Sequence, residues 1–202
     1  MNFLEKIKTK DLTECDFSNE VLEGLSLEGL SLCFSTFTCA SFKNITFKDI
    51  NFTECFVPEA DFLNCKFVNC NFERVNFQRT TFAKCYFENC FFKYAFMGLA
   101  KFIACDIINS DMENAQILDG AFITTHLKNV NFKDAILKGS YFQESVLEDI
   151  DFINTDLRSV NFKSSTLKNI KDVEAKFYGK KPWGGISSED HPLDEYNSEE
   201  VD

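Results

Sequence analysis

Large apolar side chains recur at every fifth position through most of the chain. From Leu12 to Leu167, every residue whose number ends in 2 or 7 is Phe, Leu, Ile, Met or Val, and no insertion shifts this register. A period of five fits neither the helical period of about 3.6 residues nor the two-residue alternation of a strand. The pattern therefore predicts a repeat structure in which each five-residue unit points one large side chain inward.

Two further positions of the unit have a restricted composition. The residue two before this central residue is usually small or β-branched, and most of the nine cysteines occupy it. The residue two after the centre is often Asn, Asp or Gly, which are the residues that best tolerate turns and left-handed backbone geometry. Each unit is therefore expected to supply one large and one small inward side chain, followed by a corner of the chain.

These units resemble the pentapeptide-repeat family, in which the repeat reads roughly A-(D/N)-(L/F)-x-x. Close matches are Ala60-Asp61-Phe62, Val130-Asn131-Phe132 and Ile150-Asp151-Phe152. The resemblance covers residues 11–170 and implies an all-β fold, a right-handed quadrilateral parallel β-helix with four pentapeptides in each coil. With coils spaced about 4.8 Å apart, about eight of them would form a rod of roughly 38 Å.

The stacked columns of such a rod can be read from residues 20 apart. One column is almost entirely phenylalanine, and we predict it to be a core ladder: Phe42, Phe62, Phe82, Phe102, Phe122, Phe142 and Phe162. Because coils contact only their neighbours, both ends need covering. We expect an N-terminal cap over 1–10, the β-helix over 11–170, a C-terminal cap over 171–186 and an acidic, disordered tail over 187–202.

The overall charge narrows the choice of partner. The formal net charge is −11, which argues against binding a phosphate backbone and suits a basic partner or one that normally holds nucleic acid. No apolar run approaches the roughly 18 residues of a membrane span, and the first residues lack the apolar core of a signal peptide. We therefore expect a cytoplasmic protein with reduced cysteines and no membrane contact.

The sequence contains no pattern typical of a catalytic site. His126 is predicted to face outward and His191 lies in the acidic tail, so neither has the surroundings of a general base. Cysteines five residues apart do not have the spacing of a zinc site. We expect a non-catalytic binding protein with no cofactor and no metal.

Two candidate surfaces remain on the outside of the rod. The first is a set of outward acids, namely Asp16, Asp61, Asp106, Asp111, Asp151 and Asp156. The second is an exposed apolar column formed by Leu63, Ala83, Ile103 and Ile123 with Tyr141 beside it. It would contact a partner or a second copy, or else be covered by the C-terminal segment. A sparser outward column contains Phe56, Phe96 and Ile136.

The richness in Phe and Cys, as in CKFVNCNF at residues 65–72, is similar to the quinolone-resistance and gyrase-inhibitor-immunity members of the family. Those proteins resemble B-form DNA in width and charge and bind type II topoisomerase in its place. The resemblance implies a DNA mimic that binds DNA gyrase and does not itself bind nucleic acid. The alternative is a scaffold or effector that uses the apolar column. A homodimer is open in both cases, although the amphipathic C-terminal helix through which those relatives dimerise has no counterpart here.

Overall fold

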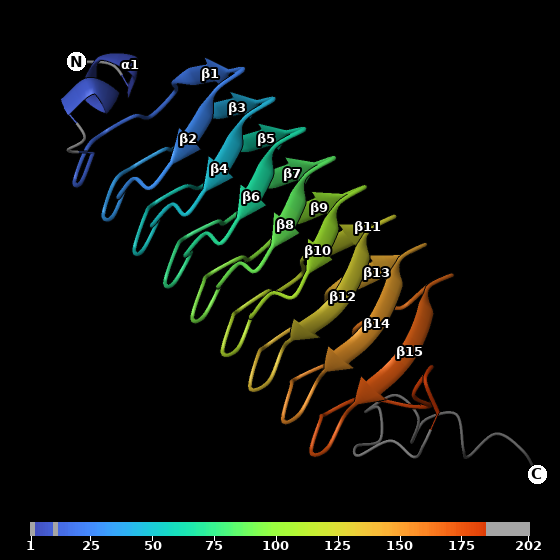
Figure 1. Ribbon diagram of the computed structural model, residues 1–202. Helices are drawn as coiled ribbons and strands as arrows, with labels where there is room; N and C mark the ends of the chain where they lie inside the picture. Colours follow the sequence, from blue (N-terminus) through green and yellow to red (C-terminus); the bar gives the residue numbers. More distant parts are fainter. Residues whose placement is uncertain (1–2, 10–11, 185–202) are drawn as a thin grey trace, which may run out of the picture.

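The computed structural model describes residues 3–9 and 12–184. The chain forms an elongated stack of similar coils, with the described ends of the chain at opposite ends of the stack (Figure 1). The predicted parallel β-helix of about eight turns is confirmed. Residues 20 apart are parallel neighbours, as Phe62 is to Phe42 and Phe82.

Two of the four sides are parallel sheets. Face 3 is the seven-stranded sheet β1 (Val21–Glu23), β3 (Ser41–Lys43), β5 (Asp61–Leu63), β7 (Thr81–Ala83), β9 (Lys101–Ile103), β11 (Ala121–Ile123) and β13 (Tyr141–Gln143). Face 4 is the eight-stranded sheet β2 (Ser26–Glu28), β4 (Thr46–Lys48), β6 (Lys66–Val68), β8 (Tyr86–Glu88), β10 (Asp106–Ile108), β12 (His126–Asn131), β14 (Val146–Asp151) and β15 (Thr166–Lys171).

The other two sides are stacks of tight turns. In these turns the residue three after the centre donates its backbone N–H to the central carbonyl, as Ala40 does to Phe37 at 3.1 Å. The residue two after the centre has a positive φ, 55° at Cys39, as in type II turns. Face 1 consists of the turns that follow Leu12, Leu32, Phe52 and every twentieth residue after them. Face 2 consists of the turns that follow Phe17, Phe37, Val57 and every twentieth residue after them. Face 1 is therefore opposite face 3, and face 2 is opposite face 4.

The central residues fill the interior. They are buried from Leu12 to Phe162, and Leu167 is partly buried near the C-terminal end. In the phenylalanine column the rings stack in parallel, with centroids 4.5 Å apart for Phe42–Phe62, whereas neighbours around one coil meet edge to face, as Phe77 and Phe82 do at 76°. Both are preferred arrangements of aromatic pairs.

The small residue two before the centre also supplies hydrogen bonds. Thr80 Oγ1 donates to the carbonyl oxygen of Val57 at 2.6 Å, Thr155 Oγ1 to that of Phe132 at 2.7 Å, and the Cys85 thiol to that of Phe62 at 3.4 Å. Among the described residues, every buried side-chain nitrogen or oxygen has a partner. These residues therefore tie each coil to the preceding one as well as filling the corner.

A short helix covers the first coil. It comprises α1 (Phe3–Lys6) and the 3-10 turn η1 (Ile7–Thr9). Phe3 is fully buried, and its ring centroid lies 5.0 Å from that of Phe17. No helix among the described residues is long and apolar enough to cross a membrane.

At the C-terminal end the coil runs past the boundary expected at residue 170. The backbone N–H of Lys176 donates to the carbonyl of Thr155 at 2.9 Å, so the ladder of bonds continues. The central position at 172 is an aspartate, and its carboxylate accepts bonds from Lys181 Nζ at 2.7 Å and Trp183 Nε1 at 2.9 Å. These bonds satisfy a charge that would otherwise be unfavourable there. The expected tail, 187–202, lies outside the described residues.

Candidate interaction surfaces

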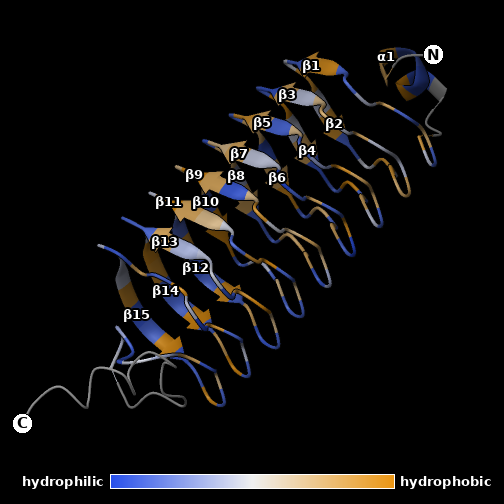
Figure 2. Ribbon diagram, turned by 180° about the vertical axis from the view of Figure 1, so that it is seen from behind, coloured by the Kyte–Doolittle hydropathy of each residue, from blue (hydrophilic) through white to orange (hydrophobic). Residues whose placement is uncertain are grey.

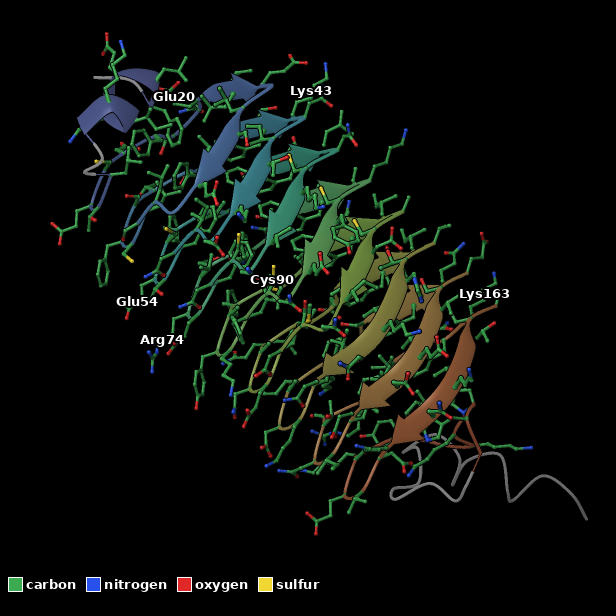
Figure 3. The ribbon with its side chains drawn as sticks, viewed as in Figure 1. Glu20, Lys43, Glu54, Arg74, Cys90 and Lys163 are labelled. Atoms are coloured by element: carbon green, nitrogen blue, oxygen red, sulfur yellow. The ribbon has the colours of Figure 1, made fainter. Side chains whose placement is uncertain are left out.

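The candidate sites among the described residues are surfaces on the outside of the rod. No group of three or more His, Cys, Asp or Glu side chains in this part of the chain could hold a metal ion. His126 faces outward, as expected, with Nδ1 3.5 Å from Asp106 Oδ1, and His191 lies outside the described residues. Most thiols point inward, as Cys90 does in Figure 3, and burial raises the pKa of Cys55 to about 12.

The predicted acids do not share one side of the rod. Asp16 and Asp156 lie near opposite ends of face 2, and Asp61 lies on face 3. Asp106 lies on face 4, and Asp111 and Asp151 lie on face 1. Three of the six acids, on faces 4 and 1, flank one edge of the rod, and the other three lie on faces 2 and 3.

Several of these acids are already partnered. Asp156 Oδ2 lies 2.6 Å from Arg158 Nη2, and this bond lowers the pKa of the Asp156 carboxyl. Asp16 accepts hydrogen bonds from the hydroxyl and the backbone N–H of Ser18, which lower its pKa. These two acids at the ends of face 2 therefore bind residues of their own turns.

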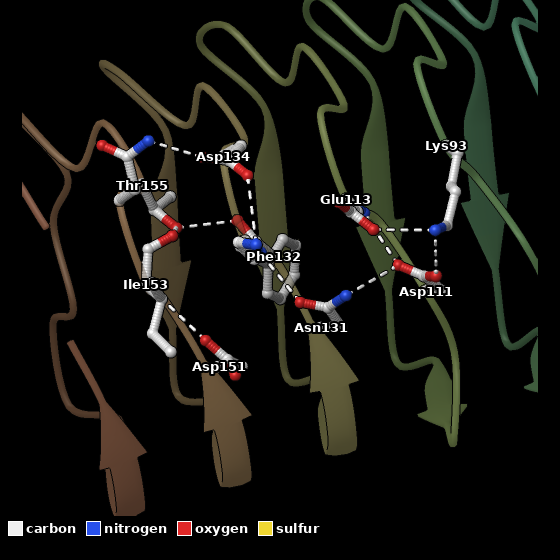
Figure 4. A network of polar contacts seen from close by, with 11 residues as sticks. Lys93, Asp111, Glu113, Asn131, Phe132, Asp134, Asp151, Ile153 and Thr155 are labelled. Atoms are coloured by element: carbon white, nitrogen blue, oxygen red, sulfur yellow. Dashed lines mark hydrogen bonds and ion pairs between the residues drawn. The ribbon is translucent and has the colours of Figure 1, made fainter. Parts of the chain in front are cut away.

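A polar network links neighbouring coils on face 1 (Figure 4). Lys93 Nζ lies 2.7 Å from Glu113 and 3.2 Å from Asp111, and the hydrogen bond to Glu113 is the main reason that the pKa of Lys93 rises to about 12. Asn131 donates to Asp111 at 3.0 Å, and Asp151 accepts the backbone N–H of Ile153 at 2.9 Å. Asp151 has no cation within ion-pair distance in the described structure, whereas Asp111 shares Lys93.

The excess of negative charge lies on faces 1 and 4, which individual acids did not reveal. On the outward and corner positions of these faces acids outnumber bases: Glu14, Glu28, Asp49, Glu54, Glu73, Glu88, Asp106, Asp111, Glu113, Asp134, Glu148, Asp149, Asp151 and Glu174 against Lys48, Lys66, Arg74, Lys93, Lys128, Lys133, Lys168 and Lys171. Faces 2 and 3 are close to balanced: Asp16, Glu23, Glu59, Asp61, Asp119, Glu144 and Asp156 against Lys43, Arg79, Lys84, Lys101, Lys138, Arg158, Lys163 and Lys176.

A groove of about 730 Å³ runs along the edge where face 4 meets face 1. Three rows of residues line it. One polar wall is the row Asn109, Asn129, Asp149 and Asn169, and the other is the row Asp111, Asn131, Asp151 and Lys171. The floor is the row of small inward residues Ser110, Val130, Ile150 and Ile170. Amides bridge successive coils along one wall, with Asn129 donating to Asn109 at 2.9 Å and Asn169 to Asp149 at 2.8 Å. This edge, which we call the acidic edge, joins the two negatively charged faces.

The predicted apolar column lies on face 3. Leu63, Ala83, Ile103 and Ile123 are successive cross-strand neighbours, and the hydrophobic character of β9 and β11 is visible in Figure 2. Leu63 is 40% exposed and Tyr141 36%. Ala121, also at an outward position and paired with Tyr141, is nevertheless buried. Lys43 and Lys163 bound this side near its two ends (Figure 3).

Sequence profiles give the family. A profile described as a pentapeptide repeat region matches residues 96–171, and one described as pentapeptide repeats (8 copies) matches 46–83 and 59–93. Together they span more than half of the chain and agree with the coils described above. The protein belongs to the pentapeptide-repeat family. A comparison with curated protein sequences gives no match.

The solved structure of HetL agrees on the fold. HetL, a pentapeptide-repeat protein involved in heterocyst differentiation regulation from the cyanobacterium Nostoc sp. strain PCC 7120, is 15% identical with a TM-score of 0.55, over 92% of this chain and 99% of HetL. QnrB1, a plasmid-mediated fluoroquinolone resistance protein, is 18% identical with a TM-score of 0.45, over 78% of this chain and 93% of that one. At such identities the likeness concerns architecture alone.

Proposed function

We propose that this rod is a non-catalytic binding protein whose acidic edge docks on a basic protein surface of the kind that normally holds DNA, with DNA gyrase as the candidate partner. The observation that carries the proposal is the excess of acids on two adjacent faces, with the other two faces near balance. A charge distributed in this way orients the rod, because it attracts a basic groove to one edge rather than to any side.

The distance between successive coils supports a comparison with DNA. Coils follow one another at about 4.8 Å, whereas phosphates on one strand of B-DNA follow at about 3.4 Å. Acids exceed bases by six on faces 1 and 4 (14 against 8), spread over about eight coils, so the rod has a lower linear density of charge than DNA although the two repeats are of similar length. The acidic edge is also a rigid surface, because hydrogen bonds between coils fix the side chains along it. A preformed partner loses little conformational freedom on binding.

The proposal is tested by adding the purified protein to a gyrase supercoiling assay, together with a gyrase pull-down. We expect inhibition, and expect it to weaken as salt rises. The variant with Asp111→Asn, Asp149→Asn and Asp151→Asn removes three charges from the acidic edge and should inhibit at least about tenfold less well, a change of about 1.4 kcal/mol.

The matched control removes three charges from face 3 through Glu23→Gln, Asp61→Asn and Glu144→Gln. It should inhibit like the parent protein, and circular dichroism should show both variants folded. Equal loss in the two variants, or no binding by the parent protein, would contradict the proposal.

A second candidate function is a scaffold or effector that binds through the apolar column of face 3, and the specific observation in its favour is the unbroken row from Leu63 to Ile123. Exposed apolar rows commonly mark contact surfaces. Under this alternative, Ile103→Lys would abolish capture of the partner, whereas the triple substitution at the acidic edge would leave it unchanged.

A further inference from the structure

One outward row of face 2 carries no charge from Thr36 to Ile136. The outward residue before each centre forms one row whose members are successive parallel neighbours, in the order Asp16, Thr36, Phe56, Asn76, Phe96, Gln116, Ile136, Asp156 and Lys176. Phe56 is 47% exposed and Ile136 37%, and at the corner of the same turns Leu99 is 41% exposed. This side therefore displays apolar side chains separated by neutral amides.

The row has matching chemistry on either side of Phe96. Moving outward in both directions, Asn76 corresponds to Gln116, Phe56 to Ile136, and Asp16 to Lys176. In the corner row of the same face, Arg79 one coil before Leu99 corresponds to Asp119 one coil after it. Two coils away Glu59 corresponds to Gly139, and in the row between these two rows Gln78 corresponds to Leu118. In each pair of the outward row from Asp16 to Lys176 the members are alike in polarity or opposite in charge, and Thr36 and Asp156 are both polar.

Such a pattern is what a twofold interface requires, because residue i of one copy meets residue j of the other, and j meets i. We propose that face 2 is the contact surface of a homodimer in which two rods lie antiparallel, with the twofold axis passing at Phe96. Phe56 then meets Ile136, Asn76 meets Gln116, and Arg79 of each copy meets Asp119 of the other.

Local geometry at the axis fits this contact. Gly98 is buried, and a Cβ added to it would lie 3.5 Å from Cζ of Phe96, so the Phe96 ring lies over the chain beside it. A ring held flat on the rod presents an aromatic face to its counterpart. Arg79 has only a long contact within its own copy, with Nη1 3.8 Å from Glu59 Oε1.

Charge selects this side over the others. Two copies of an acidic rod repel each other through faces 1 and 4, whereas face 2 has equal numbers of acids and bases: Asp16, Glu59, Asp119 and Asp156 against Arg79, Lys138, Arg158 and Lys176. Face 3 is also close to neutral, but pairing its apolar column antiparallel, with Leu63 against Ile123, sets Asp61 against Ala121. The dimer through face 2 leaves the acidic edge free, so it adds to the proposed function without depending on it.

The area of face 2 indicates how tightly the two copies should bind each other. Eight steps of about 4.8 Å from Asp16 to Lys176 and a width of about four residues at about 3.3 Å each give roughly 500 Å² per copy. The two copies would bury about 1,000 Å², at the lower limit for a specific interface. We therefore expect a dimer that dissociates in the micromolar range.

Sedimentation equilibrium of the full chain over about 1–300 μM tests the proposal. We expect a monomer–dimer equilibrium, and expect Phe96→Glu to abolish the dimer because it sets two carboxylates against each other at the axis. The matched control is Phe91→Glu, an exposed phenylalanine in the same coil on face 1, which should leave the dissociation constant unchanged.

The charge pair gives a second, independent test. Arg79→Asp and Asp119→Arg should each weaken the dimer at least about fivefold, and the double swap should restore it, because the opposite charges then meet again. A monomer throughout the range, a dimer that survives Phe96→Glu, or single swaps that the double swap does not rescue would overturn the proposal.

Discussion

At the scale of single residues, the side chain two positions before each centre does more than fill space, because some of these side chains also make hydrogen bonds between coils. Thr80 is fully buried, and its hydroxyl donates to the Val57 carbonyl in the preceding coil. Cysteine makes the same contact less strongly, with the Cys105 thiol 3.3 Å from the Phe82 carbonyl. Ser, Thr and Cys at this position therefore add a hydrogen bond to the preceding coil, which Ala, Val and Ile at the same position do not.

Thr80→Val keeps the shape of the side chain but removes the donor. We expect a loss of about 1–3 kcal/mol in the free energy of unfolding, because a buried carbonyl loses a partner. Chemical denaturation measures this loss. Thr81→Val, at the neighbouring outward position, is the control and should change stability by no more than about 0.5 kcal/mol. Equal effects at the two positions would contradict the role given to the hydroxyl.

Backbone strain is concentrated at the corners. Thr124 has φ = 51°, a region that β-branched residues adopt at a cost. Other corners have asparagine, as at Asn64 with φ = 53°. Thr124→Asn should therefore raise the free energy of unfolding by about 1 kcal/mol, measured by denaturation. Thr38→Asn, at an outward position that lacks the positive φ, should give no comparable gain. If Thr124→Asn leaves stability unchanged or lowers it, the backbone at Thr124 is not strained.

At the scale of the element, the last coil depends on one ionised side chain. Burial disfavours the charged form of Asp172, but the hydrogen bonds from Lys181 and Trp183 outweigh it and hold the carboxyl pKa below its usual value. The aromatic contacts of Trp183, whose ring centroid lies 5.5 Å from those of Phe162 and Phe177, then close the end of the rod. Protonating Asp172 should loosen this end first.

The fluorescence of Trp183, the single tryptophan in the chain, reports on this end. Because the pKa of Asp172 is lower in the folded state, its stabilising effect is fully present above the unfolded pKa of about 4 and is lost as the pH falls through the folded value. We expect the tryptophan emission to change below about pH 4, before global unfolding. Asp172→Asn should remove this transition, and Asp61→Asn should not. If the transition persists in Asp172→Asn, another group causes it and the role given to Asp172 is wrong.

At the scale of the whole molecule, the sequence predicted the architecture because one period governs it. A register without insertions fixes which residues are central, and residues 20 apart become neighbours without further information, as Leu63 and Ala83 do. The end of the coil was harder to place, since Asp172 breaks the apolar rule and is accommodated by Lys181 and Trp183 from outside the repeat.

The surfaces were only partly predictable, because charge has to be summed over a side of the rod. Acids such as Asp16 and Asp106 look equivalent in sequence but lie on different faces with different neighbours. The acidic edge required knowing that Asp149 and Asp151 flank a groove rather than a flat sheet. The matching along face 2 was present in the sequence, but it becomes apparent only when Phe56, Phe96 and Ile136 are read as one row.

The measurement that tests the central claim most directly is competition between this protein and a DNA duplex for gyrase, followed by fluorescence anisotropy of the labelled duplex. We predict that the protein displaces the duplex, and that the Asp111→Asn, Asp149→Asn and Asp151→Asn variant displaces it at least about tenfold less well. Binding to gyrase that leaves the duplex in place, or displacement unaffected by those substitutions, would contradict the claim that the acidic edge takes the place of DNA.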